Sequence, residues 1–585
     1  MSGEADAVII GSGPGGATVA EVLTRAGWSV VIIEKGRNHL LDPDDLTKPS
    51  GDYSNDEIKF TSRYFLGPDP LTEPRAFRRN AGEGEHTHVG EVNSIPTTVG
   101  GGGTHADGKV PRFREEDFRT HSLLGPQPDA HVEDWPLDYQ ELEPYYAEVE
   151  RAIGVAGRAG ANPFAAWRSG PYPMPPGAPM YGATLSSKAA EKIGLHPYEA
   201  PTAANSVAYD GRPACNNCGF CAFFGCPIHA KGDPVALLTK AMATGRATLM
   251  AETYVSRILT NGRRATGVEY IDADGATHTM GANLVVVAGG AIETPRLLLL
   301  SGLEHPSLGR HLMVHFQTIV VGHFPTLGLH PQKGRSVTHV HDDAMVQDDG
   351  ARAAATEAGV PWIRGGLVEH SGGGHTIMAA RHTPWGRAHA QAMAAGDLRD
   401  HMWAFIMQGE DLPYATNTVD LSPSIRDARG YPVARVTYEP GRHELAASKH
   451  HGKILQRVLE EMGAEYVIHT SSPGVSYHGI GATPIPESRH VIGTARMGDN
   501  PDTAVCDRWG RVHEWDNVIV ADSSVFVTAT GYGPTLTLVA LAARAAHHLA
   551  DSKPMGPEPG GAVAGEHGPG PGATPAEPAA APAAD

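Results

Sequence analysis

The strongest constraint on this chain lies at its start, where glycines follow an apolar stretch at a fixed spacing. Residues Ala7 to Ile10 are expected to form a strand, and Gly11-Ser-Gly13-Pro-Gly-Gly16 follows directly. A predicted helix and a second predicted strand at 29–33 come next, and Glu34 ends that strand. The first glycine permits a tight turn, the second lets a pyrophosphate approach the backbone, and the third lets helix and strand pack closely. The pattern predicts a dinucleotide-binding unit in which Glu34 accepts hydrogen bonds from the adenosine ribose.

Three further segments, far apart in the sequence, are expected to complete the same site. They are Val99-Gly-Gly-Gly-Gly-Thr104-His105, the apolar run Leu284–Ala288 with Gly289-Gly290-Ala291 behind it, and the strand Asn517–Asp522 followed by Gly533-Pro-Thr-Leu-Thr537. Proline suits the first turn of a helix because the N–H that it lacks would have no partner there. A helix is therefore predicted to begin at Pro534, with its positive end toward the cofactor.

These segments, together with His490-Val-Ile-Gly-Thr494-Ala-Arg496-Met-Gly498, resemble the glucose-methanol-choline (GMC) family of FAD oxidoreductases. That family carries an N-terminal ADP-binding turn, a Gly-rich flavin loop, and a C-terminal block of the form HxxGTxRMG and NPTLT. The resemblance covers nearly the whole chain except its tail. Because of Thr104-His105 and a cysteine cluster, it is closest to the branch of pyranose oxidase and the gluconate and fructose dehydrogenase flavoproteins.

The fold class expected is α/β, with a discontinuous Rossmann-like FAD-binding domain and a substrate domain on an antiparallel sheet. The cofactor strands lie at the start, middle and end of the chain, so other segments must be inserted between them. Alternation near 318–321 and 431–438 predicts strands, and 444–462 is predicted to be helical. The predicted boundaries are 1–120, 200–310 and 485–550 for the FAD domain, 121–199 and 311–484 for the substrate domain, and 551–585 for a disordered Pro/Gly/Ala tail.

The resemblance implies that FAD is the cofactor and that His490 is the base that removes a hydroxyl proton from the substrate. It also implies that His105 either bonds covalently to the flavin or contacts it without a bond. Where the family pattern has an Asn or His before Pro-Thr, this chain has Gly533, and Tyr532 or Thr530 is a candidate replacement. The predicted cofactor-binding residues are Gly11, Gly13, Gly16, Glu34, Gly102, Thr104, His105, Val255, Asp522, Pro534 and Thr535.

Four of the five cysteines cluster at Cys215, Cys218, Cys221 and Cys226. Short spacings of this kind let thiolates converge on an iron-sulfur cluster. Structural zinc, buried thiols and a disulfide are the alternatives. Cys506 has no partner in sequence and is expected to be a packing residue.

Composition narrows the partners of the chain. A net charge of -19 over 585 residues, without a prominent run of Lys or Arg, argues against nucleic acid. No apolar run approaches the length of about 20 residues that a transmembrane helix needs. No secretory segment is visible, so a cytoplasmic location is expected.

The sequence thus predicts an enzyme that oxidises an alcohol, with a sugar, sugar acid or glycoside as the expected donor of a secondary hydroxyl. A sterol or other bulky alcohol is the alternative substrate, and an apolar pocket would favour it. A flavoprotein subunit that only transfers electrons is a second alternative, and the electron acceptor, whether small molecule or partner subunit, stays open.

Overall fold

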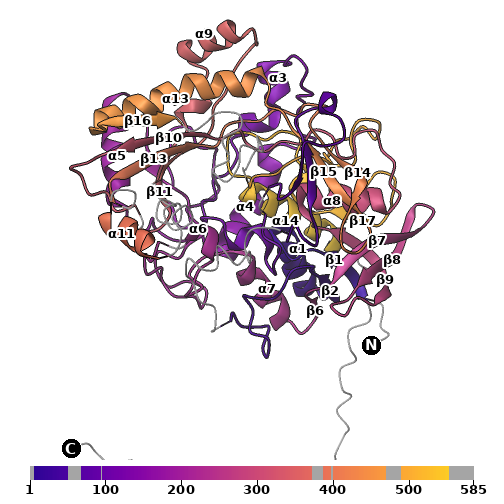
Figure 1. Ribbon diagram of the computed structural model, residues 1–585. Coiled ribbons are helices and arrows are strands. Elements are labelled where there is room, and N and C mark those ends of the chain that lie inside the picture. The colour runs from indigo at the N-terminus through magenta and orange to yellow at the C-terminus, as the bar shows by residue number, and fades with distance from the viewer. Residues whose placement is uncertain are drawn as a thin grey trace, which may run out of the picture.

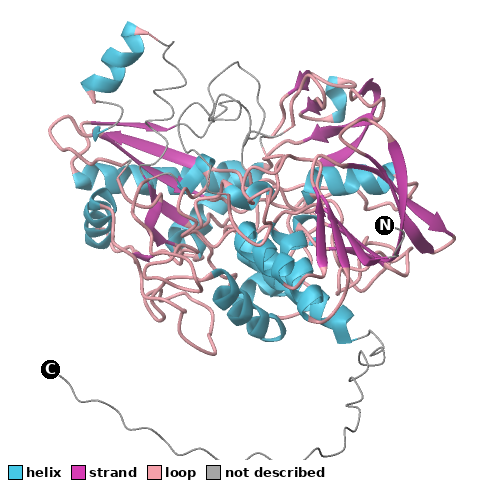
Figure 2. Ribbon diagram, turned by 90° about the horizontal axis from the view of Figure 1, so that it is seen from below, coloured by secondary structure: helices cyan, strands magenta, loops and turns pink. Residues whose placement is uncertain are grey.

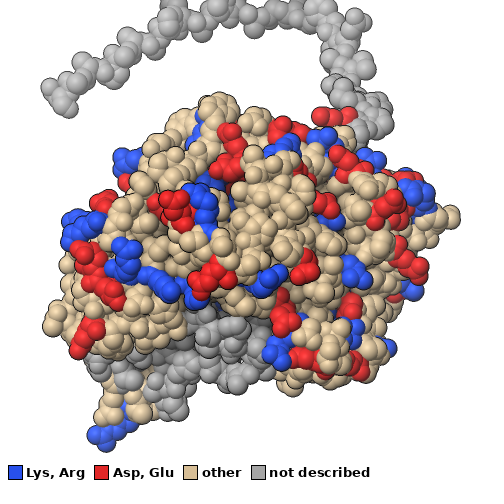
Figure 3. All heavy atoms as spheres, turned by 90° about the horizontal axis from the view of Figure 1, so that it is seen from above, with Lys and Arg blue, Asp and Glu red and all other residues tan. Residues whose placement is uncertain are grey.

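The computed structural model describes residues 5–50, 68–93, 95–219, 221–331, 333–371, 386–396, 400–469 and 489–551. The predicted disordered tail lies outside these residues except for Asp551, which ends the last helix. None of the helices in the described ranges combines the length and the apolar character needed to cross a bilayer. Acidic and basic side chains are interspersed over the face shown in Figure 3.

The N-terminal glycine turn belongs to a seven-stranded sheet that is parallel at its centre (Figure 1). Strand β1 (Ala5–Ile10) pairs in parallel with β2 (Val30–Ile33) and with β9 (Thr277–Val287). Strand β6 (Ala247–Met250) continues beyond β2, and β17 (Val518–Val520) pairs in parallel with β9. Strands β7 (Tyr254–Asn261) and β8 (Arg264–Ile271) extend the sheet antiparallel to β9. Segments from the start, middle and end of the chain therefore form one sheet, as the sequence predicts.

Helices cover this sheet and bury its apolar strands. Helix α1 (Pro14–Arg25) packs against α7 (Pro234–Ala243) and α14 (Thr535–Asp551), and α14 packs against α4 (Tyr139–Ile153). Helix α8 (Gly290–Leu300) contacts β7. The central strand residues Val8, Ile9, Val285 and Val286 are fully buried, so both faces of the parallel strands lie in the core.

The predicted substrate domain contains an antiparallel sheet of six strands in the order β16-β10-β13-β12-β11-β5. One face of this sheet packs on α5 (Tyr181–Lys192) and α13 (Arg442–Met462), the helix predicted at 444–462. Seen as in Figure 2, strands gather toward two ends of the molecule and helices lie between them. The strands are β5 (Tyr198–Glu199), β10 (Thr318–His323), β11 (Val337–His341), β12 (Val368–Ser371), β13 (Met402–Met407) and β16 (Tyr466–His469).

A third sheet joins the insertion to an early part of the chain. It has the order β14-β15-β3-β4, and β15 (Pro432–Thr437) is the strand predicted near 431–438. This strand pairs in parallel with β3 (Arg75–Arg78), not with the six-stranded sheet. The insertion therefore contributes to two sheets, a division that alternation alone did not predict. The remaining strands are β4 (His88–Gly90) and β14 (Thr418–Arg426); the other helices are α3 (Thr120–Leu124), α6 (Cys221–Phe224), α9 (Asp349–Ala358) and α11 (Arg387–Ala395).

Candidate active site

A cavity of about 380 Å³ lies at the carboxyl ends of the parallel strands and reaches the six-stranded sheet. Ile10, Glu34, Ala288 and Asp522, which end or follow β1, β2, β9 and β17, all line it. Ligands of open α/β sheets bind at this edge because the loops and helix starts of successive units meet there. The cavity is therefore the natural cofactor and substrate site of the fold.

The glycines of the first turn are placed as their predicted roles require. Gly11 has φ +102°, and a Cβ there would lie 2.4 Å from the carbonyl oxygen of Ala288. A Cβ on Gly16 would lie 2.0 Å from the carbonyl oxygen of Gly11, so only glycine lets helix α1 pack this closely. A Cβ on Gly13 would meet nothing within 4 Å, and Gly13 lines the cavity, so its backbone is open to a ligand.

Three helices begin at the cavity wall. Pro14 of α1, Gly290 of α8 and Thr535 of α14 all line it. The first N–H groups of a helix have no partner within the helix, and its dipole is positive at that end. The three helix starts therefore suit the pyrophosphate of a dinucleotide and the negative charge that a flavin ring gains on reduction.

Asp522 holds two of the cavity segments in place. Its Oδ2 accepts hydrogen bonds from Gly290 N at 2.8 Å and from Thr294 Oγ1 at 2.5 Å, and its Oδ1 accepts from Ser524 N at 2.8 Å and from Ser524 Oγ at 2.5 Å. Burial raises the pKa of this carboxyl, against the effect of these hydrogen bonds. Asp522 thus ties the end of β17 to the start of α8 at the position predicted to bind cofactor.

Glu34 lines the cavity and is also part of the glycine turn. Its Oε2 accepts hydrogen bonds from Ser12 N at 3.0 Å and Ser12 Oγ at 2.7 Å, and its Oε1 accepts from Gly36 N at 2.8 Å. Ser12 Oγ in turn accepts from Gly100 N at 2.9 Å. A carboxylate has about four acceptor positions, so Glu34 retains capacity for a ribose hydroxyl while it fixes the turn.

The loop of four glycines lies beside that turn. Gly102 and His105 line the cavity, whereas Thr104 turns inward and donates a hydrogen bond to the carbonyl oxygen of Gly101 at 2.8 Å. Lys231 Nζ donates to the carbonyl oxygens of Thr104 at 2.5 Å and Ala106 at 2.9 Å, on both sides of His105. The predicted cofactor-binding residues that line the cavity are Gly11, Gly13, Glu34, Gly102, His105, Val255, Asp522, Pro534 and Thr535. Gly16 and Thr104 support the turns behind it.

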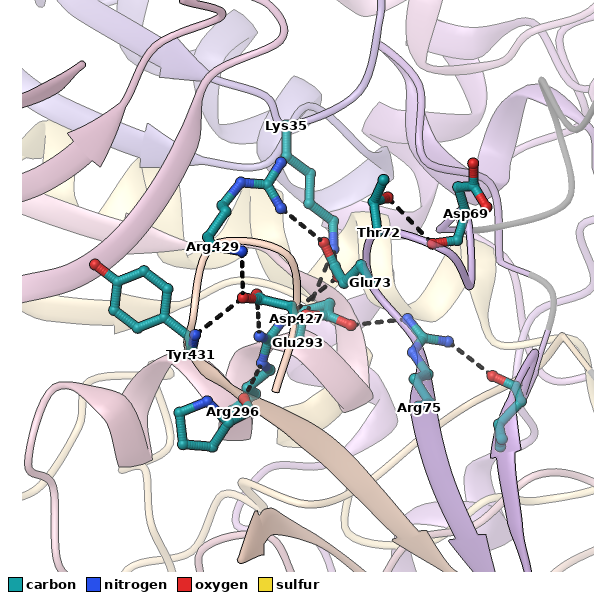
Figure 4. Close-up of polar contacts among 12 residues, drawn as sticks. Lys35, Asp69, Thr72, Glu73, Arg75, Glu293, Arg296, Asp427, Arg429 and Tyr431 are labelled. Carbon is teal, nitrogen blue, oxygen red and sulfur yellow. Dashed lines mark hydrogen bonds and ion pairs between the residues drawn. The ribbon is translucent and has the colours of Figure 1, made fainter. Parts of the chain in front are cut away.

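A network of charged side chains, several of which line the cavity, begins at Lys35 next to Glu34 (Figure 4). Glu73 contacts Lys35 at 2.5 Å, Arg296 at 3.4 Å and Arg429 at 3.6 Å. Arg296 also contacts Asp427 at 2.7 Å. These residues come from the end of β2, the loop before β3, helix α8 and the β14–β15 turn, so the network joins the first and third sheets.

Glu293 is the acidic residue of the network that lines the cavity, and three cations surround it there. It contacts Arg75 at 2.8 Å, Arg296 at 3.3 Å and Lys35 at 3.4 Å. Burial by itself raises the pKa of Glu293, but the three cations outweigh burial and hold the pKa well below its usual range. The carboxylate is therefore charged at neutral pH and keeps the cations in place at the cavity wall.

His490 lies at the other end of the cavity, where its hydrogen bond to His315 defines its tautomer. His315 Nε2 lies 3.1 Å from the carbonyl oxygen of Ala529, which can only accept, so this nitrogen carries the proton. Burial lowers the pKa of His315 to about 4, so its ring is neutral and its Nδ1 is an acceptor. His490 Nδ1 lies 3.0 Å from that Nδ1 and must donate to it. Nε2 of neutral His490 is consequently the nitrogen with the basic lone pair.

The environment of His490 keeps the ring neutral. Burial, followed by the nearby His315, Lys109 and Arg489, lowers the pKa of His490 well below 6.5. Its ring is therefore neutral at neutral pH, and His490 lines the cavity.

The six-stranded sheet supplies the floor of the cavity near His490. Ile319, Ile406 and Glu369 pair across neighbouring strands and line the cavity in one row. Gln408 Nε2 donates to Glu369 Oε1 at 2.6 Å, and Gln317 Nε2 donates to Gln408 Oε1 at 2.9 Å. Both glutamines line the cavity. The substrate end thus presents carboxylate and amide groups among isoleucines.

Gly533 faces His490 directly. A Cβ at this position would lie 3.7 Å from Cε1 and 4.0 Å from Nε2 of His490, which is ordinary contact. Neither suggested replacement for a side chain here lines the cavity in the described part of the chain. The Tyr532 hydroxyl donates to Asp342 Oδ2 at 2.6 Å, and Thr530 is fully buried.

The cysteine segment lies close to the flavin loop. Burial raises the pKa of the Cys221 thiol, and Cys215 and Cys226 lie near enough to raise it further. Lys231 Nζ contacts the carbonyl oxygen of Cys221 at 3.3 Å, and Ala222 lines the cavity. Within the described residues, no group of three or more His, Cys, Asp or Glu side chains is arranged to hold a metal ion. The arrangement does not fit an iron-sulfur cluster or zinc site. Cys506 is fully buried, as a packing residue should be.

Comparison with known proteins agrees with the fold and the site. Two family models described as GMC oxidoreductase match residues 179–317 and 413–542, and an FAD binding domain model matches residues 4–43. The 2-methyl-1,2-propanediol dehydrogenase of Mycolicibacterium austroafricanum is 30% identical, over 93% of this chain and 95% of that protein. The gluconate 2-dehydrogenase flavoprotein of Pantoea cypripedii is 28% identical, over 92% of each chain.

The crystal structure of pyridoxine 4-oxidase from Mesorbium loti has the same fold, with a TM-score of 0.58, 18% identity, and coverage of 93% of this chain and 99% of that one. The family models and the named relatives, together with the cavity at the strand ends, define the chain as an FAD-dependent oxidoreductase that acts on alcohol groups. The chain belongs to the GMC oxidoreductase family, as the sequence motifs predict. The residues that line the cavity fit FAD, because the open backbone at Gly13, the carboxylate of Glu34 and the three helix starts all line it.

Proposed function

We propose that this enzyme oxidises a hydroxyl of a polyhydroxylated small molecule, such as a sugar, sugar acid or glycoside, and that His490 is the base. The observation that carries the proposal is the orientation of His490. The hydrogen bonds from Ala529 through His315 leave Nε2 as the basic nitrogen of a histidine that lines the cavity. A base in this position accepts the hydroxyl proton as the carbinol is oxidised.

FAD supplies the hydride acceptor when bound. The turn at Gly11–Gly16, the start of α14 and Glu34 would hold it. Asp522 and Lys231 support this wall through their hydrogen bonds to α8 and to the loop around His105. The task of His490 is to take the proton while the carbon–oxygen bond of the substrate becomes a carbonyl.

The polar floor supports a polyhydroxylated substrate over a sterol. Gln317, Gln408 and Glu369 offer donors and acceptors that can pair with several hydroxyl groups. These groups already pair with one another, but a sterol would desolvate the donor and acceptor positions that remain without offering partners, at a cost of about 1–3 kcal/mol for each position left unpaired. The base at His490 also supports an enzyme over a subunit that only transfers electrons.

A short 1,2-diol is a second candidate substrate. It is favoured by the similarity over 93% of this chain to a 2-methyl-1,2-propanediol dehydrogenase. The two candidates differ in their need for contacts with the floor. Gln408→Leu should lower kcat for gluconate or glucose and have little effect on 2-methyl-1,2-propanediol, if remote hydroxyls help to position the reacting carbon.

The test is anaerobic reduction of the bound flavin by glucose, gluconate, a methyl glucoside, 2-methyl-1,2-propanediol and cholesterol. We expect a sugar derivative to bleach the flavin fastest. Bleaching by cholesterol alone would contradict the proposal. Acid precipitation of the same preparation tests whether His105 bonds covalently to the flavin or only contacts it, since covalently bound flavin stays with the protein. Reoxidation of the reduced flavin by oxygen, a quinone or a dye then identifies the class of electron acceptor.

A further inference from the structure

The missing side chain at Gly533 leaves a space that borders two residues. A methyl group on Gly533 would lie 4.0 Å from Nε2 of His490 and 3.9 Å from Cε of Lys109. The space next to the basic nitrogen is therefore walled by a lysine from the loop that follows His105. Neither Tyr532 nor Thr530 lines the cavity there, whereas Lys109 does.

Lys109 is held at this wall by carboxylates. Its side chain is 3% exposed, its ammonium forms a hydrogen-bonded ion pair with Glu369, and Asp107 Oδ2 lies 4.0 Å away. Burial lowers the pKa of Lys109, but Glu369 and Asp107 outweigh burial and raise it, so the ammonium stays charged. An ammonium has three N–H donors, so the ion pair with Glu369 leaves capacity for a ligand oxygen.

We propose that Lys109 takes the place of the absent side chain at 533 and donates a hydrogen bond to the substrate oxygen that is being oxidised. The inference rests on the proposed role of His490. As the hydroxyl proton moves to Nε2 and a hydride leaves the same carbon for FAD, the carbon–oxygen bond becomes a carbonyl. Negative charge develops on the oxygen if the proton leaves first. A fixed cation in a site that excludes water stabilises that charge.

This role differs from that of a counter-ion for Glu369. A counter-ion would matter for folding alone, whereas a donor to the reacting oxygen would matter for the rate. The charged or titratable groups that perturb His490 are His315, Lys109 and Arg489, and Lys109 lowers its pKa. Removal of the ammonium should therefore also raise the pKa of His490 and move the acid limb of the rate profile to higher pH.

The experiment measures anaerobic flavin reduction by the fastest alcohol of the substrate panel. The variants are Lys109→Met, and Lys109→Met combined with Glu369→Gln so that Glu369 does not remain as an unpaired buried carboxylate. Both variants should bind FAD. The alcohol should reduce their flavin about 10²- to 10³-fold more slowly than that of the wild type, which is the typical effect of one lost donor to a developing oxyanion. Lys109→Ala, which vacates the space that methionine would fill, should be slowed as well, and ethylammonium should partly restore its rate. Gly533→Asn should partly restore the rate of Lys109→Met, since φ at 533 is not in the left-handed region. Lys192→Met, which removes an exposed lysine paired with Glu461, is the matched control and should retain the rate.

Two results would overturn the inference. One is wild-type flavin reduction in both folded variants, with an unchanged pH profile. The other is an equal loss in Glu369→Gln alone, with no rescue of Lys109→Ala by ethylammonium or of Lys109→Met by Gly533→Asn. If His490→Ala reduces flavin at the wild-type rate, the proposed function fails as well. A slow His490→Ala beside a fast Lys109→Met would reject only the role of Lys109.

Discussion

His315 should be required for rapid catalysis, although it is not among the described residues that line the cavity. It is the acceptor for His490 Nδ1, at 3.0 Å, and so favours the tautomer with a basic Nε2. Without it, that tautomer has a buried N–H group that has lost its partner. Such a group costs about 1–3 kcal/mol. Because about 1.4 kcal/mol corresponds to a factor of ten, we expect flavin reduction to slow roughly 5- to 150-fold.

The variants must respect the backbone of His315, whose φ is +53°. Glycine adopts this conformation readily and asparagine tolerates it better than most residues. His315→Gly should show the full loss, and added imidazole should restore part of the rate by filling the vacated space. His315→Asn keeps an amide oxygen as a potential acceptor and should lose less.

The assay is stopped-flow flavin reduction under anaerobic conditions, with melting temperature and flavin content measured on the same preparations. KM should change little, because His315 acts through His490 and not on bound substrate. Wild-type flavin reduction in folded His315→Gly would refute the tautomer argument. A loss that imidazole does not relieve, and that His315→Asn shares in full, would point to a role in packing.

Further predictions concern the cofactor wall and the cysteines. Gly16→Ala should yield unstable protein without FAD, measured by flavin content, because its Cβ would lie 2.0 Å from the Gly11 carbonyl oxygen. Glu34→Ala should lose FAD on dialysis, through both the ribose contact and the loosened Ser12 turn, unless His105 holds the flavin covalently. The depressed pKa of Glu293 contributes stability that is present above its ordinary value of 4.5 and is lost as pH falls below it; Arg296→Met should weaken this dependence of melting temperature on pH. Cys218→Ser should leave iron content and visible spectrum unchanged, because no group of three ligands among the described residues is placed to hold a metal ion.

The sequence alone predicted the main backbone features of the cofactor-binding half of the molecule. The glycine turn, the Glu34 strand end and the start of α14 depend on local rules of backbone geometry, and those rules are visible in the chain itself. The structure places Gly11, Gly13 and Glu34 at one cavity, as the motif predicts. The family resemblance, confirmed by the comparisons, then identified FAD.

The substrate half could not be predicted in the same way. Lys109, Glu369 and Gln408 come from distant segments and carry no local pattern, so only the three-dimensional structure brings them together. Nothing in the sequence sets His315 apart from the other histidines among the 31, and only the structure shows its contact with His490. The cysteine spacing predicted a metal cluster, but among the described residues no group of three or more ligands is placed to hold a metal ion. The pairing of β15 with β3 was missed because short strands with charged residues give little alternation.

The most direct test of the central claim is anaerobic titration of the purified wild-type protein and His490→Ala with the substrate panel, followed by the visible spectrum of the flavin. The account predicts that both proteins contain FAD, that a sugar derivative or diol bleaches the wild-type flavin, and that His490→Ala bleaches about 10²- to 10⁴-fold more slowly. Equal rates of bleaching in the two proteins, or a wild-type flavin that none of the alcohols reduces, would contradict it.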